Sequence, residues 1–346
     1  MIWLTWRQLR LGLVATCVLV TAACVWLATT GPALARLAHR NTDVYDLLTD
    51  THRLLFNGGI AALAVLPAVL GIFWGAPLVA RELETGTYRL AWSQSVTRSR
   101  WLASKLGLTV LAGAAVTAVL ATAVTWWAAP IDGAQGGQQG SLPSRMTPIA
   151  FGMRGVVPIG YAIFALVLGT FVGLVVRRSV AAMAITLAVY VFIQIAVPMW
   201  VRPHLVAPVS ITETISESTI DGITAEAGGP FNITLQTPDS RDWAITNQTI
   251  DADGNATDLP AWFADCLPPP PGAEGRDSQG TVQAHPSTGT LDACLTRLDA
   301  EGYRQRLVYH PLSHFWRLQW AETALYLTAS GLLAGLSFWW LRRRLS

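Results

Sequence analysis

The sequence predicts an all-α polytopic membrane domain of six transmembrane helices, with a mixed α+β extracytoplasmic domain inserted between helices 5 and 6. Of the 346 residues, 52% are hydrophobic and only 13% are charged, whereas an ordinary soluble domain carries about 25% charged residues. The deficit comes from six long runs with almost no charge, each long enough to cross a hydrocarbon core about 30 Å thick. One long polar and acidic stretch separates the last two runs.

The chain begins with a short amphipathic segment, Met1–Arg10, which we expect to form an interfacial helix that leads into the first span. The predicted spans are Leu11–Thr30, Gly58–Val79, Leu106–Ala129, Gly155–Val176, Val180–Val201 and Trp320–Leu341. The first run is longer than the apolar core of a usual signal peptide, so we interpret it as a retained span. The first five runs contain no ionisable acidic or basic residue, and the sixth carries Glu322 near its outer end. This absence disfavours a proton- or sodium-coupled carrier.

The distribution of arginine and lysine predicts the orientation of these spans. Basic residues outnumber acidic ones in the N-terminal segment, between spans 2 and 3, between spans 4 and 5, and in Arg342–Arg344. Placing all four on the same side puts both termini in the cytoplasm and residues 202–319 outside. The predicted organisation is therefore residues 1–201 with five spans, an extracytoplasmic domain at 202–319, and the last span with a basic tail at 320–346.

The most charged stretch beside the predicted spans lies between spans 2 and 3, at Ala76–Lys105. It contains five basic and two acidic residues, with tryptophans interleaved. Such density favours a folded segment on the membrane surface over a simple charged turn. We expect Glu82 and Glu84 near the start of a helix and Arg98, Arg100 and Lys105 near a helix end, where they would complement the helix dipole.

Three motifs in this stretch resemble the loop after the second span of type-2 ATP-binding-cassette (ABC) exporter permeases. They are Arg-Glu-x-Glu-x-Gly-Thr at Arg81–Thr87, Ser-Val-Thr-Arg at Ser95–Arg98, and Trp-Leu-x-x-x-Leu at Trp101–Leu106. The chain is most similar to the actinobacterial branch of that family, which shares the start at Met1–Gln8, the long ectodomain and the ending at Phe315–Arg344.

The resemblance implies that the loop forms a coupling helix that docks onto a separate ABC ATPase, and we therefore call residues 80–105 the coupling loop. The coupling residues it implies are Arg81, Glu82, Glu84, Gly86, Thr87, Arg89 and Arg98. It further implies a second permease subunit, in a homodimer or a heterodimer, and a multi-pass location in a bacterial cell membrane. The expected function is export of a hydrophobic or amphipathic substrate, driven by ATP that the partner subunit binds.

The outer region contains β-like runs at Asn232–Leu235 and Trp243–Thr246, a predicted helix at Leu291–Ala300 and a predicted strand at Tyr303–Tyr309. Its 15 acidic and seven basic residues make it acidic. Cys266 and Cys294 are the only cysteines there, and the space outside a bacterial membrane permits disulfides. We expect these two to be joined, the alternatives being free thiols or a bond between protomers.

Three predicted spans carry the G-x-x-x-G pattern, which permits close approach of helices. The glycines are Gly71 and Gly75, Gly169 and Gly173, and Gly331 and Gly335. We expect helix packing at these positions. Pro67 in the middle of the second span predicts a kink, which could either serve gating or be a static bend.

Other chemistries find little support in the sequence. No glycine is followed by lysine, so the chain has no G-x-x-x-x-G-K-[ST] loop of its own for nucleotide phosphates. His310 and His314 have a spacing that suits a metal, but Pro311 follows the first and no third ligand is evident, so we expect no metal site. We expect no catalytic residue, no cofactor and no nucleic-acid partner, and the chain is predicted to be a non-catalytic membrane subunit. The alternative is a six-span sensor or scaffold whose acidic ectodomain binds a ligand or partner.

Overall fold

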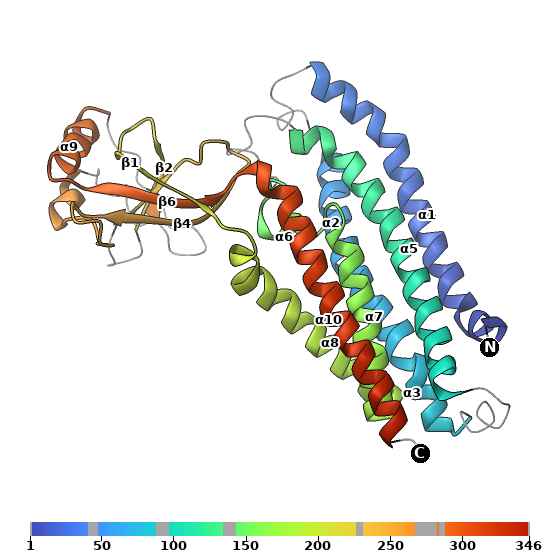
Figure 1. Ribbon diagram of the computed structural model, residues 1–346. Helices are drawn as coiled ribbons and strands as arrows, with labels where there is room; N and C mark the ends of the chain where they lie inside the picture. The colour runs from blue at the N-terminus through green and yellow to red at the C-terminus, as the bar shows by residue number, and fades with distance from the viewer. Residues whose placement is uncertain are drawn as a thin grey trace. The chain divides into compact units, whose positions relative to one another are not determined.

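The computed structural model describes residues 2–40, 48–87, 97–133, 143–225, 231–266, 282–283 and 288–344. The chain folds as two compact units (Figure 1). The helical unit comprises Met1–Val206 and Phe315–Ser346, and the β unit comprises Ala207–His314. The described residues contain six helical segments that are long and apolar enough to cross a membrane. They are Gly12–Ala38, Asp50–Thr85, Arg98–Gly133, Val157–Val176, Ser179–His204 and Leu312–Arg343.

The helical unit is built from eight described α-helices, some of them joined end to end. They are α1 (Ile2–Arg40), α2 (Asp50–Leu70), α3 (Ala76–Thr85), α5 (Arg98–Gly133), α6 (Pro148–Phe151), α7 (Val157–Val176), α8 (Ser179–Ala196) and α10 (Phe315–Arg344). A π-helical turn, Gly71–Gly75, joins α2 to α3, four residues after Pro67. A second π-helical turn, Val197–Val201, and a 3₁₀ turn, Arg202–His204, extend α8.

Several helices are longer than the apolar runs that predicted them. The expected interfacial helix and first span form one continuous helix, α1. Likewise α5 includes Lys105 and Asp132, and the extended α8 reaches Arg202, so ionisable residues lie inside the helical spans. The physical reason is that each of these three side chains has an opposite charge as its partner, so a helix can continue past the last apolar residue without an unpaired buried charge. The helical unit accordingly reaches a few residues beyond each expected border of the outer region, to Val206 and from Phe315.

Helix α7 lies at the centre of the helical unit and packs against α2, α3, α5, α8 and α10 (Figure 1). Two of the glycine pairs meet here. A Cβ atom on Gly75 would lie 2.7 Å from the carbonyl oxygen of Leu166, and one on Gly169 would lie 2.7 Å from the backbone nitrogen of Ala76. Such distances are far below van der Waals contact, so only glycine permits this approach of the two backbones.

The third glycine pair behaves differently. A Cβ atom on Gly331 or Gly335 would meet no atom within 4 Å. These two glycines therefore make no close helix contact within the part of the chain that the structure describes, contrary to the expected packing. The G-x-x-x-G spacing places both glycines on one face of α10, but spacing alone does not determine which face a neighbouring helix covers.

Only Arg177 and Arg178 separate α7 from α8. Helix α7 ends at Val176, Arg177 follows with a left-handed φ of 58°, and α8 begins at Ser179. A residue in the left-handed conformation ends a helix by redirecting the chain, and its backbone N–H here donates to the Gly173 carbonyl.

The β unit contains two antiparallel sheets. Its described strands are β1 (Val209–Glu213), β2 (Ile220–Ala225), β3 (Phe231–Leu235), β4 (Trp243–Ile250), β5 (Val282–Gln283) and β6 (Arg304–His310). The strand order is β1-β6-β4 in one sheet and β3-β2-β5 in the other. The helix α9 (Thr288–Ala300), β3, β4 and β6 overlap the four predicted segments, which confirms a strand-containing region between the fifth and sixth spans of the sequence.

An apolar cluster holds α9 against the second sheet. Ile223 and Ile233 of the sheet pack with Leu291, Leu295 and Leu298, which recur on one face of α9. The structure joins Cys266 to Cys294 in a disulfide, the pairing that the sequence analysis expects. This bond ties the helical turn Ala261–Cys266 to α9.

Candidate functional site

The predicted coupling residues gather on and around α3. Helix α3 has Pro77 in its first turn, where proline is favoured. It ends before Gly86, whose φ of 72° is left-handed. Leu78 and Val79 lie on the buried face, where they pack with Trp101 and Leu102 of α5. The position of α3 is therefore determined by an apolar face that contacts α5 and α7.

Glu82 lies on the side of α3 that faces α5. Its carboxylate forms an ion pair with Lys105, whose side chain is 1% exposed. The Lys105 ammonium also lies 3.5 Å from the Leu78 carbonyl oxygen and 5.2 Å from the centre of the Trp101 ring. A buried ammonium needs such a set of partners, so this pair ties α3 to α5 in a defined geometry.

Glu84 makes a different link. Its carboxylate oxygen accepts hydrogen bonds from the backbone N–H of Ser179 at 3.0 Å and from the Ser179 hydroxyl at 2.8 Å. Ser179 is the first residue of α8. A carboxylate at a helix N-terminus satisfies a free N–H and complements the helix dipole, so Glu84 connects α3 to the start of α8.

The other predicted coupling residues differ in where the structure places them. Arg81 and Thr87 are exposed, and they line an open groove of about 540 Å³ together with Trp74 and Thr85. Arg98 is the first residue of α5. Arg89 lies outside the described residues.

The expected pairing of charges with the ends of one helix is wrong. Glu82 and Glu84 lie in the last turn of α3, and Arg98, Arg100 and Lys105 lie in the first turns of α5. Each charge is therefore at the end of its helix that the dipole disfavours. The structure compensates the two glutamates through Lys105 and through the N-terminus of α8, which are contacts between elements and not along one helix.

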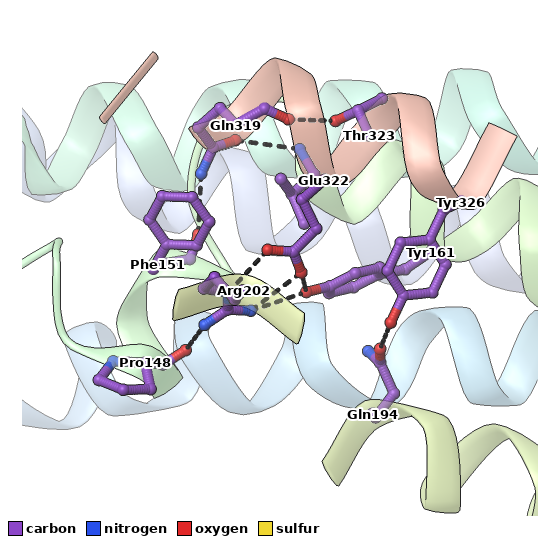
Figure 2. Close-up of polar contacts among 10 residues, drawn as sticks. Pro148, Phe151, Tyr161, Gln194, Arg202, Gln319, Glu322, Thr323 and Tyr326 are labelled. Atoms are coloured by element: carbon purple, nitrogen blue, oxygen red, sulfur yellow. Dashed lines mark hydrogen bonds and ion pairs between the residues drawn. The ribbon is translucent and has the colours of Figure 1, made fainter. Parts of the chain in front are cut away.

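A second polar cluster lies in the helical unit where α10 begins, and the sequence analysis did not anticipate it (Figure 2). Arg202 and Glu322 form a two-bond ion pair, Nε to Oε2 at 2.7 Å and Nη2 to Oε1 at 3.0 Å. The Tyr161 hydroxyl donates to Glu322 at 2.5 Å, and Arg202 donates to the Pro148 carbonyl at 2.6 Å. The side chains of Arg202 and Glu322 are 1% and 0% exposed. We call this group the Arg202 cluster.

Two amide side chains extend the Arg202 cluster (Figure 2). The Gln319 carbonyl oxygen accepts from the backbone N–H groups of Val156 and Val157, and its amide donates to the Phe151 carbonyl at 2.9 Å. The Tyr326 hydroxyl donates to Gln194 at 2.8 Å. Gln319 therefore satisfies the first N–H groups of α7, which a preceding residue would otherwise have to cap.

One open groove in the helical unit borders the Arg202 cluster. It has a volume of about 620 Å³ and lies between α2, α8 and the α6 segment. Most of its lining is apolar, from residues such as Val65 and Val191, and Tyr161, Gln194 and Arg202 supply the polar part. Ligand sites commonly combine an apolar lining with a few polar groups in this way.

Sequence reasoning missed the Arg202 cluster because its two charged members lie 120 positions apart. One signal was available: Glu322 is the only acidic residue in the six predicted runs. A carboxylate in a span is expected to have a partner. Arg202, placed directly after the fifth run, was then one of the candidates at the same end of the bundle, together with Arg154 and Arg317.

The fold and these sites define a polytopic membrane protein whose helices are tied together by buried ion pairs at both ends of the bundle. A family model described as ABC-2 membrane transporter related matches residues 9–202. The chain therefore belongs to the ABC-2 membrane transporter related family. No curated protein and no solved structure matches it.

Membership in this family identifies the chain as an ABC-2-type membrane permease and implies an ABC ATPase as its partner. The matched residues include α3, both predicted coupling glutamates and Arg202. They end before the β unit, which begins at Ala207.

Proposed function

We propose that the chain is the membrane subunit of an ABC exporter, powered by a separate ATPase that docks at α3. The observation that carries this proposal is the position of α3 between three other helices. Its buried face packs on α5 and α7, Glu82 pairs with Lys105 of α5, and Glu84 binds the first residue of α8. A displacement of α3 would therefore be transmitted to all three helices through these direct contacts.

The groove beside α3 supports docking at this end. Arg81, Thr85 and Thr87 present polar groups there, next to the apolar side chains of Phe73 and Trp74. An interface commonly has an apolar centre and a polar rim. Two such permeases, identical or different, would pack together with two ATPases, and ATP-driven closure of the ATPases would move each α3.

The substrate we propose is hydrophobic or amphipathic. The groove next to the Arg202 cluster is mostly apolar with a few polar groups on one wall, which suits a molecule with both characters. In the proposed orientation both termini and α3 are cytoplasmic, and the β unit lies outside the cell membrane, where the Cys266–Cys294 disulfide would be stable.

Co-purification tests the docking. The tagged chain, isolated with its native partners, should carry a protein that has the G-x-x-x-x-G-K-[ST] motif and hydrolyses ATP. Replacing the exposed Arg81 by Glu should release this protein, whereas Arg36→Glu, an exposed arginine on α1, should not. A purified chain without any nucleotide-binding partner would refute the exporter, and equal retention by both variants would remove α3 from the docking surface.

A further inference from the structure

The β unit contains a polar pocket that the proposed transport function does not use. Its volume is about 510 Å³, within the range of about 300–1,000 Å³ that is usual for small-molecule sites. It lies where the edge strand β3 meets the edge strand β4 of the other sheet, at Asn232 and Gln248. The segment that returns after β4, at Thr257 and Asp258, forms another wall.

The floor of the pocket is held by hydrogen bonds between the two sheets. The Thr249 hydroxyl donates to Gln305 at 2.8 Å, and the Gln305 amide donates to Asn247 and to the Ile233 carbonyl, both at 2.7 Å. Asn247 in turn donates to the Leu235 carbonyl at 3.2 Å. These bonds fix the floor before any ligand arrives, which reduces the cost of ordering on binding.

Hydrogen bonds also hold the wall that follows β4. Asp251 accepts hydrogen bonds from the backbone N–H groups of Asp253 and Asn255 at 3.0 and 2.8 Å. The backbone N–H of Thr257 donates to the Thr249 carbonyl at 3.0 Å. The turn therefore folds back onto β4 and keeps Asp258 beside the pocket.

The groups at the rim are polar and unused. Among the residues that the structure describes, the side chains of Asn232, Gln248 and Asp258 form no hydrogen bond or ion pair, and all three are exposed. Each amide offers donors and an acceptor, and the carboxylate offers two acceptor oxygens. Together they can serve several hydroxyl groups, because a hydroxyl both donates and accepts.

The charges of the pocket lining and of the whole β unit restrict the class of ligand. The pocket lining contains one carboxylate and no basic residue. Between Ala207 and His314 acidic residues outnumber basic ones by 15 to five, so an anionic ligand would be repelled. A cation would find a single carboxylate, whereas the five amide and hydroxyl side chains suit a neutral partner.

We propose that this pocket binds a neutral, hydroxyl-rich ligand, namely a sugar unit of an uncharged oligosaccharide. Asn232 and Gln248 would hold adjacent hydroxyls from the two sheet edges, and Asp258 would accept from a third hydroxyl. The half-buried Phe231 provides an apolar wall for the C–H groups of a sugar ring. This inference does not depend on transport, because it concerns residues of the β unit alone.

The experiment uses the full chain in phospholipid nanodiscs, prepared without glycoside detergents, since these would compete for the pocket. The probes are maltohexaose, cellohexaose and mannohexaose, with oligogalacturonate as the anionic comparison and a neutral Gly/Ser decapeptide as the peptide comparison. Calorimetric titration should show saturable binding of at least one neutral hexasaccharide and none of the anionic one. The double variant Asn232→Ala/Gln248→Ala should weaken that binding about tenfold or more, because each hydrogen bond to the ligand contributes severalfold to affinity.

The matched control is Thr212→Ala/Gln236→Ala, which removes two polar side chains from exposed positions of the β unit outside the pocket. It should bind like the unaltered chain. Both double variants should retain the Cys266–Cys294 disulfide and an unchanged unfolding transition, which separates loss of binding from loss of fold. The proposal is overturned if no neutral probe binds at millimolar concentration, if only the decapeptide binds, or if pocket and control variants bind alike.

Discussion

Replacing Glu322 by Leu should destabilise the helical unit strongly, because it leaves the Arg202 guanidinium buried without its counter-charge. Arg202 is 1% exposed, and two of its hydrogen bonds end on Glu322. Removing one partner of a buried ion pair costs about 3–5 kcal/mol. Since about 1.4 kcal/mol is a tenfold change, the unfolding equilibrium should shift by a factor of roughly a hundred to several thousand.

The double variant Arg202→Met/Glu322→Leu should cost less than Glu322→Leu alone, because apolar residues can replace a buried ion pair at little cost. Arg202→Met, Glu322→Leu and the double variant form a double-mutant cycle. Unfolding by sodium dodecyl sulfate in mixed micelles, followed by the fluorescence of the 15 tryptophans, measures each of them. Arg36→Met removes an exposed arginine and serves as the control. If the double variant costs as much as the sum of the single ones, the two residues are not coupled and the reasoning fails.

Three further predictions follow from the packing, the disulfide and the proposed orientation. Gly173→Leu should lower the stability of the helical unit by about 1–3 kcal/mol or more, because a side chain there would clash with the backbone of α3. Gly331 has open space around it in the described structure, so Gly331→Leu should be nearly neutral in the same unfolding assay. Equal effects of the two variants would contradict the packing. Cys294→Ser should destabilise the β unit by about 3–4 kcal/mol for a loop of this length, seen as a lower unfolding temperature; an unchanged transition would show that the bond contributes nothing. In a background without the free cysteines of α1, a membrane-impermeant maleimide added to intact cells should label Asn255→Cys and not Thr87→Cys, and the reverse pattern would invert the proposed topology.

The apolar runs predicted the six spans because a run of about 20 consecutive uncharged residues is visible in the sequence itself. The ends of the spans were less predictable. Lys105 looked like a member of the coupling loop, yet Glu82, 23 residues away, allows it to lie buried in α5. Arg202 looked like the start of the outer region, yet Glu322 holds it in the helical unit. A sequence pattern does not reveal which distant charge will compensate a given residue.

The glycine pairs also show what a sequence pattern can predict and what it cannot. The spacing of Gly71, Gly75, Gly169 and Gly173 correctly indicated a close contact, and the structure brings these two pairs together. Identical spacing at Gly331 and Gly335 produced no such contact within the described chain. The pattern states that a helix can be approached closely, whereas the lengths and faces of the neighbouring helices determine whether it is.

The extended α8 is held at its two ends by different kinds of polar contact, and this difference bears on how motion would pass through it. At the Arg202 cluster, the ion pair with Glu322 and the bond from Gln319 to the Phe151 carbonyl are buried. The bond from Arg202 to the Pro148 carbonyl is partly buried. A rearrangement would therefore expose several unpaired groups at once. At α3, the bond from Glu84 to Ser179 is exposed to solvent, and water can replace it at small cost. In the proposed transport cycle, the link from α3 to α8 would therefore yield first, and the Arg202 cluster would act as the fixed end about which α7, α8 and α10 tilt.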